Sequence, residues 1–522
     1  MDDSRTESAL APAIRAGVYA CFFLSGATAL VLQILWSRQF VTVFGNSAYA
    51  ISVVLCAFMA GLGVGGWLGG RLADRLSGRL LLYGGMQAGI GLCAAGIPVA
   101  LAALRRWAPR VALLAPESLL LPGVTRFVVS FAILFVPCLL MGATLPALVR
   151  FCAESRQVMG GRIGLLYGLN TLGAAAGCFA AGYWMVDTLG LSLTNALAVS
   201  ATLLVAAAAV GLDLAWRRHA VLRPAPVEEV RGTGPPGARD HEVNASERGR
   251  RARKLLPLVA FVSGLAALSC EVLWFRYLAF LTNVVYSFTN ILGVYLLGLA
   301  AGSLVYRVAL ARSKDPIRPL SAVLMLLGLA VPLCFAAGAL IYSSSPPAFL
   351  SPLAMTALTV LVPTVLMGTA FPLVCAAYTQ SVATVGRSVG VVYAFNTLGA
   401  IVGSLIPVFL LIPRLGIQPS IFLMAFAYAA SGALLWLAAA PRRRLLGPAG
   451  VTTLAPLAVV LVAVVVPADL CRRVLLSTSV TLGSHNEILF YREGRTGTAT
   501  VVRDRISGIK KLYINSVGEV PT

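Results

Sequence analysis

The feature that most constrains this chain is a series of uncharged apolar runs, each about as long as the roughly 20 residues that a helix needs to cross a bilayer. Residues 191–212 and 447–468 are two of them. Only 12% of the residues are charged, whereas soluble domains average about one quarter. Because lipid offers no partner to an unpaired backbone, such runs must be helical. The sequence therefore predicts an integral membrane protein surrounded by a lipid bilayer.

The distribution of basic residues predicts how the chain is oriented. The net charge is +21, which in a soluble protein would suggest a nucleic-acid partner. Here the basic residues fall in connections after even-numbered spans, such as Arg71, Arg75 and Arg79 after the second span and a cluster within residues 217–254 after the sixth. The positive-inside rule places these connections and the N-terminus in the cytoplasm. We therefore predict no nucleic-acid partner.

The sequence contains an internal duplication. "VPCLLMGATLP" from Val136 matches "VPTVLMGTAFP" from Val362, and "YGLNTLGAAAGCF" from Tyr167 matches "YAFNTLGAIVGSL" from Tyr393. Upstream of each pair, "LSGATALVLQILWSRQF" matches "VSGLAALSCEVLWFRYL". Because the matches keep the same order in both copies, the whole unit is duplicated.

Each copy is predicted to contain six spans. They begin near residues 16, 46, 79, 124, 161 and 191 in the first copy and near 254, 284, 317, 350, 388 and 417 in the second. An even number of spans returns the chain to its starting side, so the copies are parallel repeats related by an axis along the membrane normal. This arrangement resembles the two halves of major facilitator transporters.

The predicted fold is therefore an all-α polytopic membrane protein with a short β-hairpin after the helices. The predicted segments are a cytoplasmic N-terminus at 1–15, a first repeat at 16–216, a cytoplasmic linker at 217–253, a second repeat at 254–440, a thirteenth membrane helix at 447–468 and a soluble segment at 469–522. With thirteen crossings, the soluble segment lies on the outer side of the membrane.

A charged loop after the second span supports the comparison with major facilitator transporters. "GGRLADRLSGR", at residues 69–79, resembles the loop signature that joins the second and third helices of that family. The resemblance implies that Asp74, Arg75 and Arg79 take part in a cytoplasmic latch built on charge and a helix dipole. The alternative is an ordinary basic turn that follows the positive-inside rule.

Ionisable residues inside spans are costly and are candidates for function. Glu271 lies deep in the seventh span, with Arg276 five residues further on, and the matching residues of the first copy are Gln33 and Arg38. A carboxylate at this depth could bind a cationic amine or carry a proton. Alternatively, Glu271 pairs with an arginine of a neighbouring helix.

Two polar pairs occupy equivalent places in the two copies. Tyr167 and Asn170 match Tyr393 and Asn396. These side chains could line a central cavity, or the asparagines could form hydrogen bonds between helices beside small residues. The sequence leaves both interpretations open.

The last residues of the chain are soluble in character. "TATVVR" at 498–503 and "IKKLYI" at 509–514 are rich in β-branched and aromatic residues, and "DRISG" between them is typical of a hairpin turn. Two strands alone are only marginally stable in water. The hairpin is therefore expected to begin a larger unit.

"YREGRTGTATVV" and "KKLYINSVGEV", together with the duplicated "LW.R" and "NTLGA" helices, resemble bacterial membrane proteins of the fused major facilitator/spermidine synthase family. The resemblance implies an inner (plasma) membrane protein whose tail opens the N-terminal β domain of a polyamine aminopropyltransferase. In that family the catalytic aspartate lies in a Rossmann domain that also binds decarboxylated S-adenosylmethionine. No position of this chain matches that domain, so we predict no catalytic residue in it. Decarboxylated S-adenosylmethionine is expected only with a downstream or separate Rossmann domain.

Two functions follow from these observations. The first is the membrane module and opening β segment of a spermidine synthase-like protein, with aminopropyl transfer implied by resemblance alone. The alternative is a major facilitator-like secondary transporter of polyamines or other small amines. The ten cysteines form no CxxC pair and the three histidines lie outside the spans, so we predict no metal site.

Overall fold

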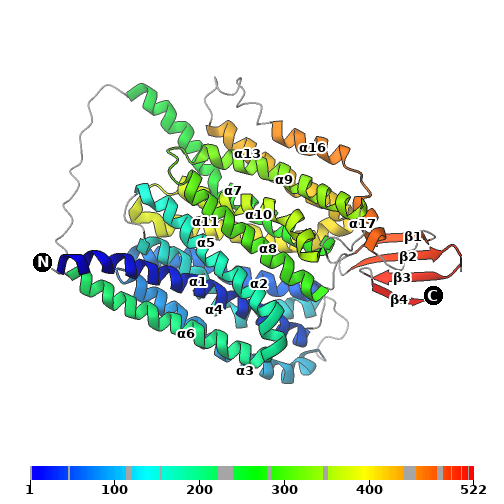
Figure 1. The fold of residues 1–522 in the computed structure, drawn as a ribbon, viewed down its shortest axis with the longest axis horizontal. Coiled ribbons are helices and arrows are strands. Elements are labelled where there is room, and N and C mark those ends of the chain that lie inside the picture. Colours follow the sequence, from blue (N-terminus) through cyan, green and yellow to red (C-terminus); the bar gives the residue numbers. More distant parts are fainter. Residues whose placement is uncertain are drawn as a thin grey trace.

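A computed structural model of the chain describes residues 3–44, 48–112, 120–152, 156–221, 239–278, 284–344, 351–439, 454–478, 486–494, 497–506, 508–514 and 517–521. The long helices run side by side in one bundle, and a small sheet lies beyond one end of it (Figure 1). We call the end at which α1 begins the N-terminal end of the bundle and the opposite end the sheet end.

The first half of the bundle is built from long apolar helices of the first repeat. They are α1 (Asp3–Phe44), α2 (Ala48–Arg75), α3 (Arg79–Ala112), α4 (Leu120–Cys152), α5 (Arg156–Ala180) and α6 (Val186–Val221), with a π-helical turn η1 (Ala181–Met185) between the last two. Gly190 has a φ of +73° and breaks α6 near its start. A left-handed backbone of this kind favours glycine.

The second half repeats this plan. Its elements are α7 (Arg239–Leu278), α8 (Val284–Val305), η2 (Tyr306–Leu310), α9 (Ile317–Ser344), α10 (Pro352–Tyr378), η3 (Val382–Thr384), α11 (Val385–Ile406), η4 (Pro407–Leu411), α12 (Ile412–Leu415) and α13 (Ile417–Ala439). Of these, η2 and η4 are π-helical turns that extend α8 and α11.

Most of these helices are long and apolar enough to cross a membrane. Among the described residues, 10 segments meet that condition, and one of them, Gly160–Arg218, contains both α5 and α6. The predicted all-α polytopic membrane fold is therefore confirmed.

The duplication reappears in the way that helices cross. A Cβ on Gly173 of α5 would lie 1.9 Å from the carbonyl oxygen of Phe23 on α1, and a Cβ on Gly399 of α11 would lie 1.9 Å from that of Phe261 on α7. Only glycine permits so close an approach. The two crossings occupy matching positions of the repeats, so both halves pack in the same way.

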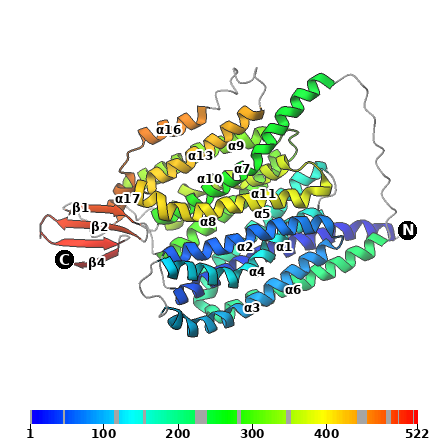
Figure 2. The same ribbon diagram turned by 180° about the vertical axis from the view of Figure 1, so that it is seen from behind.

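The described part of the predicted thirteenth span is a short helix, α16 (Ala455–Val465). Its 11 residues extend about 16 Å at 1.5 Å per residue, less than the roughly 30 Å of a hydrocarbon core. Residues 447–453 of that prediction lie outside the described residues. Because α13 ends at the N-terminal end and α17 (Leu470–Thr478) lies at the sheet end, the chain passes along the bundle between them (Figures 1 and 2).

The tail forms a four-stranded antiparallel sheet in the order β1 (Asn486–Glu493), β2 (Thr498–Asp504), β3 (Lys510–Ile514) and β4 (Val517–Pro521). The predicted hairpin is β2 and β3, with Arg503 opposite Lys510. Gly508, at a φ of +71°, donates its N–H to the carbonyl of Asp504 at 2.8 Å and closes the turn. The sheet thus has two more strands than the sequence predicts.

Candidate functional site

A polar cavity of about 190 Å³ lies among the helices of the first half and reaches the second half. Its polar lining consists of hydroxyl and amide side chains from α1, α3, α4, α5 and α11: Ser25, Thr28, Gln33, Gln87, Thr144, Asn170, Thr171 and Tyr393. Leu296 of α8 also contributes to the wall. We call this space the central cavity.

Hydrogen bonds fix two of the amide groups that line the central cavity, those of Gln87 and Asn170. The side-chain N–H of Gln87 donates to the Ser25 hydroxyl at 2.5 Å, and that of Asn170 donates to the carbonyl of Phe22 at 3.2 Å. Asn170 thus lies in the wall of the cavity and also bonds α5 to α1. Its counterpart Asn396 presents its backbone carbonyl to Gly264, where an added Cβ would lie 1.8 Å from the oxygen.

An aromatic layer lies between the central cavity and the N-terminal end of the bundle. The rings of Tyr167 and Phe371 have centroids 4.7 Å apart, and those of Phe371 and Tyr393 are 6.2 Å apart. Gly66 of α2 packs directly on the ring of Tyr393, because a Cβ there would lie 2.3 Å from the ring. Both predicted tyrosines thus meet in one layer between the halves.

Asp74 joins the two halves at the N-terminal end. Its carboxylate, at the end of α2, accepts the backbone N–H groups of Gly386 at 3.1 Å and Arg387 at 2.8 Å. These groups belong to the first turn of α11, where unpaired N–H groups and the helix dipole favour an anion. Arg150 of α4 lies 3.3 Å from the same carboxylate. We call Asp74, Arg150 and the first turn of α11 the interhalf latch.

The other two residues predicted for the latch, Arg75 and Arg79, are not part of the interhalf latch. Arg79 donates to the carbonyl of Ala73 at 3.3 Å, within its own half, and the Arg75 side chain is exposed. Sequence reasoning missed Arg150, which is 76 positions away from Asp74 in the chain. Only the packing of α4 against α2 brings the two charges together.

Close glycine contacts hold the halves together beside the latch. A Cβ on Gly70 of α2 would lie 2.4 Å from the carbonyl oxygen of Gly386, and a Cβ on Gly164 of α5 would lie 2.7 Å from the ring of Tyr306 in η2. Contacts this close require α2 to lie directly against α11 and α5 to lie directly against η2 at these positions. The halves are therefore in contact at the N-terminal end along α2–α11 and α5–η2.

Glu271 lies apart from the central cavity. It is not one of the residues that line that space, although its half-buried side chain is within electrostatic range of Cys178 on α5 and Tyr295 on α8. Its matching residue Gln33 does line the cavity. The two equivalent positions therefore have different surroundings.

The two equivalent arginines lie at the sheet end. Arg38 pairs with Asp187, at the start of α6, with 3.9 Å between their charged atoms. Arg276 instead donates to the carbonyl of Gly494, just after β1, at 2.7 Å. Arg276 thus binds the tail.

Glu493 completes the attachment of the sheet to the second half. Its carboxylate accepts the backbone N–H of Ile417, the first residue of α13, at 2.5 Å, and the hydroxyl of Tyr491 at 2.5 Å. Burial and the neighbouring Glu493 carboxylate raise the pKa of the Tyr491 phenol, so Tyr491 remains a proton donor. We call Arg276, Tyr491, Glu493 and the start of α13 the sheet anchor.

Solved structures with the same arrangement of helices are transporters. The fucose:proton symporter of E. coli superposes with a TM-score of 0.51 at 16% identity, over 82% of this chain and 98% of the symporter. A bacterial homologue of the iron transporter ferroportin, in its outward-facing state, gives a TM-score of 0.54 at 12% identity, over 81% of this chain and 99% of the homologue. The chain has the major facilitator fold.

At these identities the likeness establishes the fold alone. No family model matches the sequence, and none of the curated proteins is similar to it. The major facilitator part of the expected resemblance is thus supported, whereas these comparisons lend no support to its spermidine synthase part.

Proposed function

We propose that the protein is a secondary transporter that carries a small polar solute through the central cavity. The observation that carries this proposal is the position of the cavity: it lies inside a major facilitator fold and is lined by residues of both halves, including Gln33 and Tyr393. In such folds the substrate site lies near the middle of the membrane, and the halves rock around it. The interhalf latch and the aromatic layer close one of the two exits.

The lining of the central cavity favours a neutral solute that forms hydrogen bonds. The polar groups are hydroxyls and amides, and no lining residue in the described part of the chain carries a charge. A volume of 190 Å³ corresponds to about six waters at roughly 30 Å³ each. The cavity therefore suits a small polar molecule better than a polyamine cation, whose charges would meet no carboxylate there.

Glu271 supports a role in energy coupling. Keeping a carboxylate at this depth in the membrane costs several kcal/mol of free energy, unless the carboxylate has a partner or exchanges a proton. Its nearness to Cys178 and Tyr295, on α5 of the first half and α8 of the second, places it at the seam between the halves. Proton binding there would respond to the movement of the halves. The alternative transport of small amines would instead use Glu271 to bind the cation.

Uptake into proteoliposomes tests the proposal. We would compare a neutral sugar, a neutral amino acid and spermidine, each with and without a pH gradient. Transport of a neutral solute should be reduced about tenfold or more by Gln33→Ala, because a hydrogen-bonding group in the cavity is lost. Gln380→Ala, an exposed glutamine outside the cavity, serves as the matched control.

Glu271→Gln separates coupling from substrate binding. If Glu271 carries protons, the variant should lose accumulation under a pH gradient but keep exchange of the solute across the membrane. Loss of spermidine binding alone would favour the amine alternative. Uptake of all three solutes at the level of protein-free liposomes would count against the proposal.

The orientation is proposed from charge. The connections at the N-terminal end carry Arg75, Arg79 and Arg387, so we place this end in the cytoplasm by the positive-inside rule. The central cavity is then closed toward the cytoplasm, and the sheet lies outside.

The four-stranded sheet favours a second candidate function, in which the tail begins a spermidine synthase-like domain. Its support is the sheet itself, in which "TATVV" and "KKLYI" pair as neighbouring strands. The nucleotide sequence after the Thr522 codon tests it. An open frame or a neighbouring gene that encodes a glycine-rich Rossmann domain would support this candidate, and a stop codon without such a neighbour would contradict it.

A further inference from the structure

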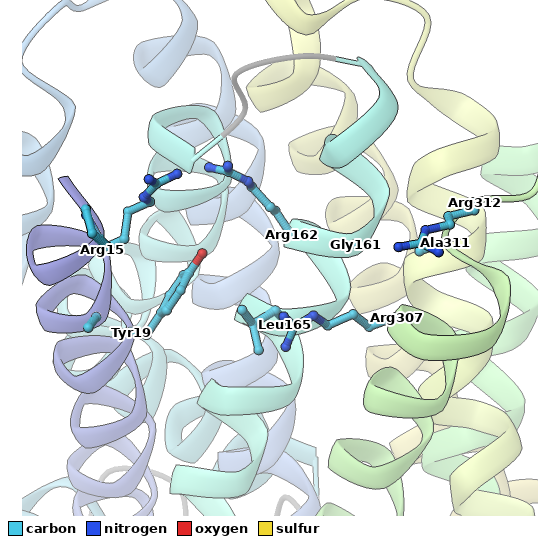
Figure 3. Close-up of a pocket in the computed structure, with 10 residues that line it drawn as sticks. Arg15, Tyr19, Gly161, Arg162, Leu165, Arg307, Ala311 and Arg312 are labelled. Atoms are coloured by element: carbon cyan, nitrogen blue, oxygen red, sulfur yellow. The ribbon is translucent and has the colours of Figure 1, made fainter. Parts of the chain in front are cut away.

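A second cavity, of about 510 Å³, lies at the N-terminal end of the bundle between α1 and α5 of the first half and η2 of the second (Figure 3). Four arginines line it, two from each half: Arg15, Arg162, Arg307 and Arg312. Among the residues that the structure describes, none that lines this space is acidic. We call this space the arginine pocket.

Two of the cationic groups approach each other in the arginine pocket (Figure 3). Arg15 and Arg162 turn their guanidinium groups toward each other above the hydroxyl of Tyr19 (Figure 3). Arg162 is fixed there by a 2.7 Å hydrogen bond to the carbonyl of Cys152, and Arg307 is also within electrostatic range of Tyr19. Three of the four arginines therefore act on the same part of the pocket.

The second half of the pocket is shaped by a π-helical turn. Ala311 donates its N–H to the carbonyl of Tyr306 at 2.8 Å, which closes η2 between α8 and the following loop. Turns of this type often occur at functional sites. The same Tyr306 packs against Gly164, so Arg307 is held directly beside the seam between the halves.

The level of the arginine pocket relative to the membrane indicates which kind of ligand can enter it. Its residues lie where membrane-spanning segments begin or end, since one segment is Pro12–Phe40 and another Phe288–Leu310. Apolar side chains, among them those of Ala16 and Leu165, complete the wall. A mixed basic and apolar surface at this level faces the boundary between hydrocarbon and headgroups.

We propose that the arginine pocket binds the phosphate group of an anionic ligand and thereby bridges the two halves. Guanidinium groups bind phosphate oxygens through paired hydrogen bonds, which suits a cluster of arginines better than any single cation. A phospholipid headgroup and a free phosphate both present this group. Because the ligand contacts both halves, it stabilises the state in which they are closed at the N-terminal end.

Ligand binding to the purified full-length protein tests the proposal. Native mass spectrometry would count retained lipids in phosphatidylglycerol and in phosphatidylcholine, and a thermal-shift series would use inorganic phosphate without added lipid. Arg307→Gln with Arg312→Gln should weaken anion binding roughly 25-fold, because each arginine near a headgroup contributes about a factor of five. Arg250→Gln with Arg251→Gln removes two exposed charges from α7 outside the pocket and should change binding by less than about twofold.

The outcomes identify the source of the phosphate. Retention of phosphatidylglycerol, but not phosphatidylcholine, that depends on Arg307 and Arg312 assigns the pocket to a lipid headgroup. If stabilisation by inorganic phosphate depends on Arg307 and Arg312 to the same degree, the pocket is assigned to a soluble anion. Arg307→Lys with Arg312→Lys keeps the charge and should restore part of the binding, which excludes misfolding as the cause. If neither anion binds more weakly to the glutamine variant than to the control, the proposal is wrong.

Discussion

Asp74 is the single side chain whose contacts most directly join the halves, because its carboxylate accepts two N–H groups at the start of α11. Asp74→Asn keeps the size of the side chain but removes its charge. Hydrogen bonds to a charged acceptor contribute about 1.5–3 kcal/mol each, so the latch should weaken by a similar amount. Hydrogen exchange at the amides of Gly386 and Arg387 should then rise about tenfold or more.

A matched control exists in the second half at the same end of the bundle. Asp315 pairs with Arg318 within its own loop and is half-exposed. Asp315→Asn should leave exchange in the first turn of α11 unchanged. Equal exchange in wild type and Asp74→Asn would mean that the carboxylate does not hold the helix end.

Asp74 can be singled out from the sequence for a physical reason. A short acidic residue in a basic turn stands out in the sequence, so its importance can be recognised from neighbouring residues alone. The partners cannot be recognised in this way, since Arg150 and the first turn of α11 come near only after α2 packs against α4 and α11. Other polar residues of the central cavity, such as Gln87, were missed for a related reason: Gln87 is neutral, and a search for charges inside spans does not find it.

Helix crossings determine whether each half can form. Gly264 of α7 lies against the carbonyl of Asn396 on α11, where an added Cβ would be only 1.8 Å from the oxygen. Gly264→Ala should separate the two helices and destabilise the protein by about 1–3 kcal/mol, as overpacking does in other cores. A thermal or denaturant unfolding series in detergent would measure the loss.

Gly96 provides the control for this substitution. It lies exposed on α3, and a Cβ there would meet nothing within 4 Å. Gly96→Ala should be neutral or slightly stabilising, because alanine favours the helix. A destabilisation of Gly264→Ala no larger than that of Gly96→Ala would contradict the close crossing.

The sheet anchor attaches the sheet to the second half of the bundle. Glu493→Gln removes a negative charge that interacts with the start of α13 and with Arg276. Each of these two interactions contributes about 0.3–1 kcal/mol, or more when it is partly buried. The sheet should detach more often, so trypsin should cut after the exposed Arg503, Lys510 and Lys511 several-fold faster.

Glu487→Gln tests whether this effect is local. Glu487 lies on the same strand, is exposed and approaches Arg505 of the same sheet at 3.8 Å. Its replacement should leave cleavage unchanged. Faster cleavage in both variants would indicate a general loss of sheet stability instead of a lost anchor.

The hairpin of β2 and β3 could be predicted because alternating residues and the "DRISG" turn are local signals. β4 could not, because "VGEVP" has no strand periodicity and is held only by its pairing with β3. The short α16 shows the converse: residues 447–468 form an apolar run long enough to cross a membrane, but the helix in the described part ends at Val465 and covers only 11 residues.

At the scale of the whole molecule, the duplication in the sequence predicted the two halves, since matching motifs imply matching helices. The fold confirms this in the equivalent crossings at Gly173 and Gly399. The seam between the halves could not be predicted, because it joins residues far apart in the chain, with Asp74 and Arg387 more than 300 positions apart. The place of the central cavity depends on that seam and therefore also had to come from the structure.

The proposed transport requires the two halves to move around the central cavity, and this movement can be measured without a known substrate. Spin labels at Ser77→Cys in the first half and Gln380→Cys in the second lie at exposed positions of the N-terminal end. The native cysteines are buried or half-buried, so labelling favours the introduced pair. Double electron–electron resonance in liposomes would give the distance distribution.

We expect a short distance in the wild-type background, from the closed state with its latch formed, and a second, longer population that grows when Asp74→Asn is added. One unchanged distance in both proteins would contradict the account.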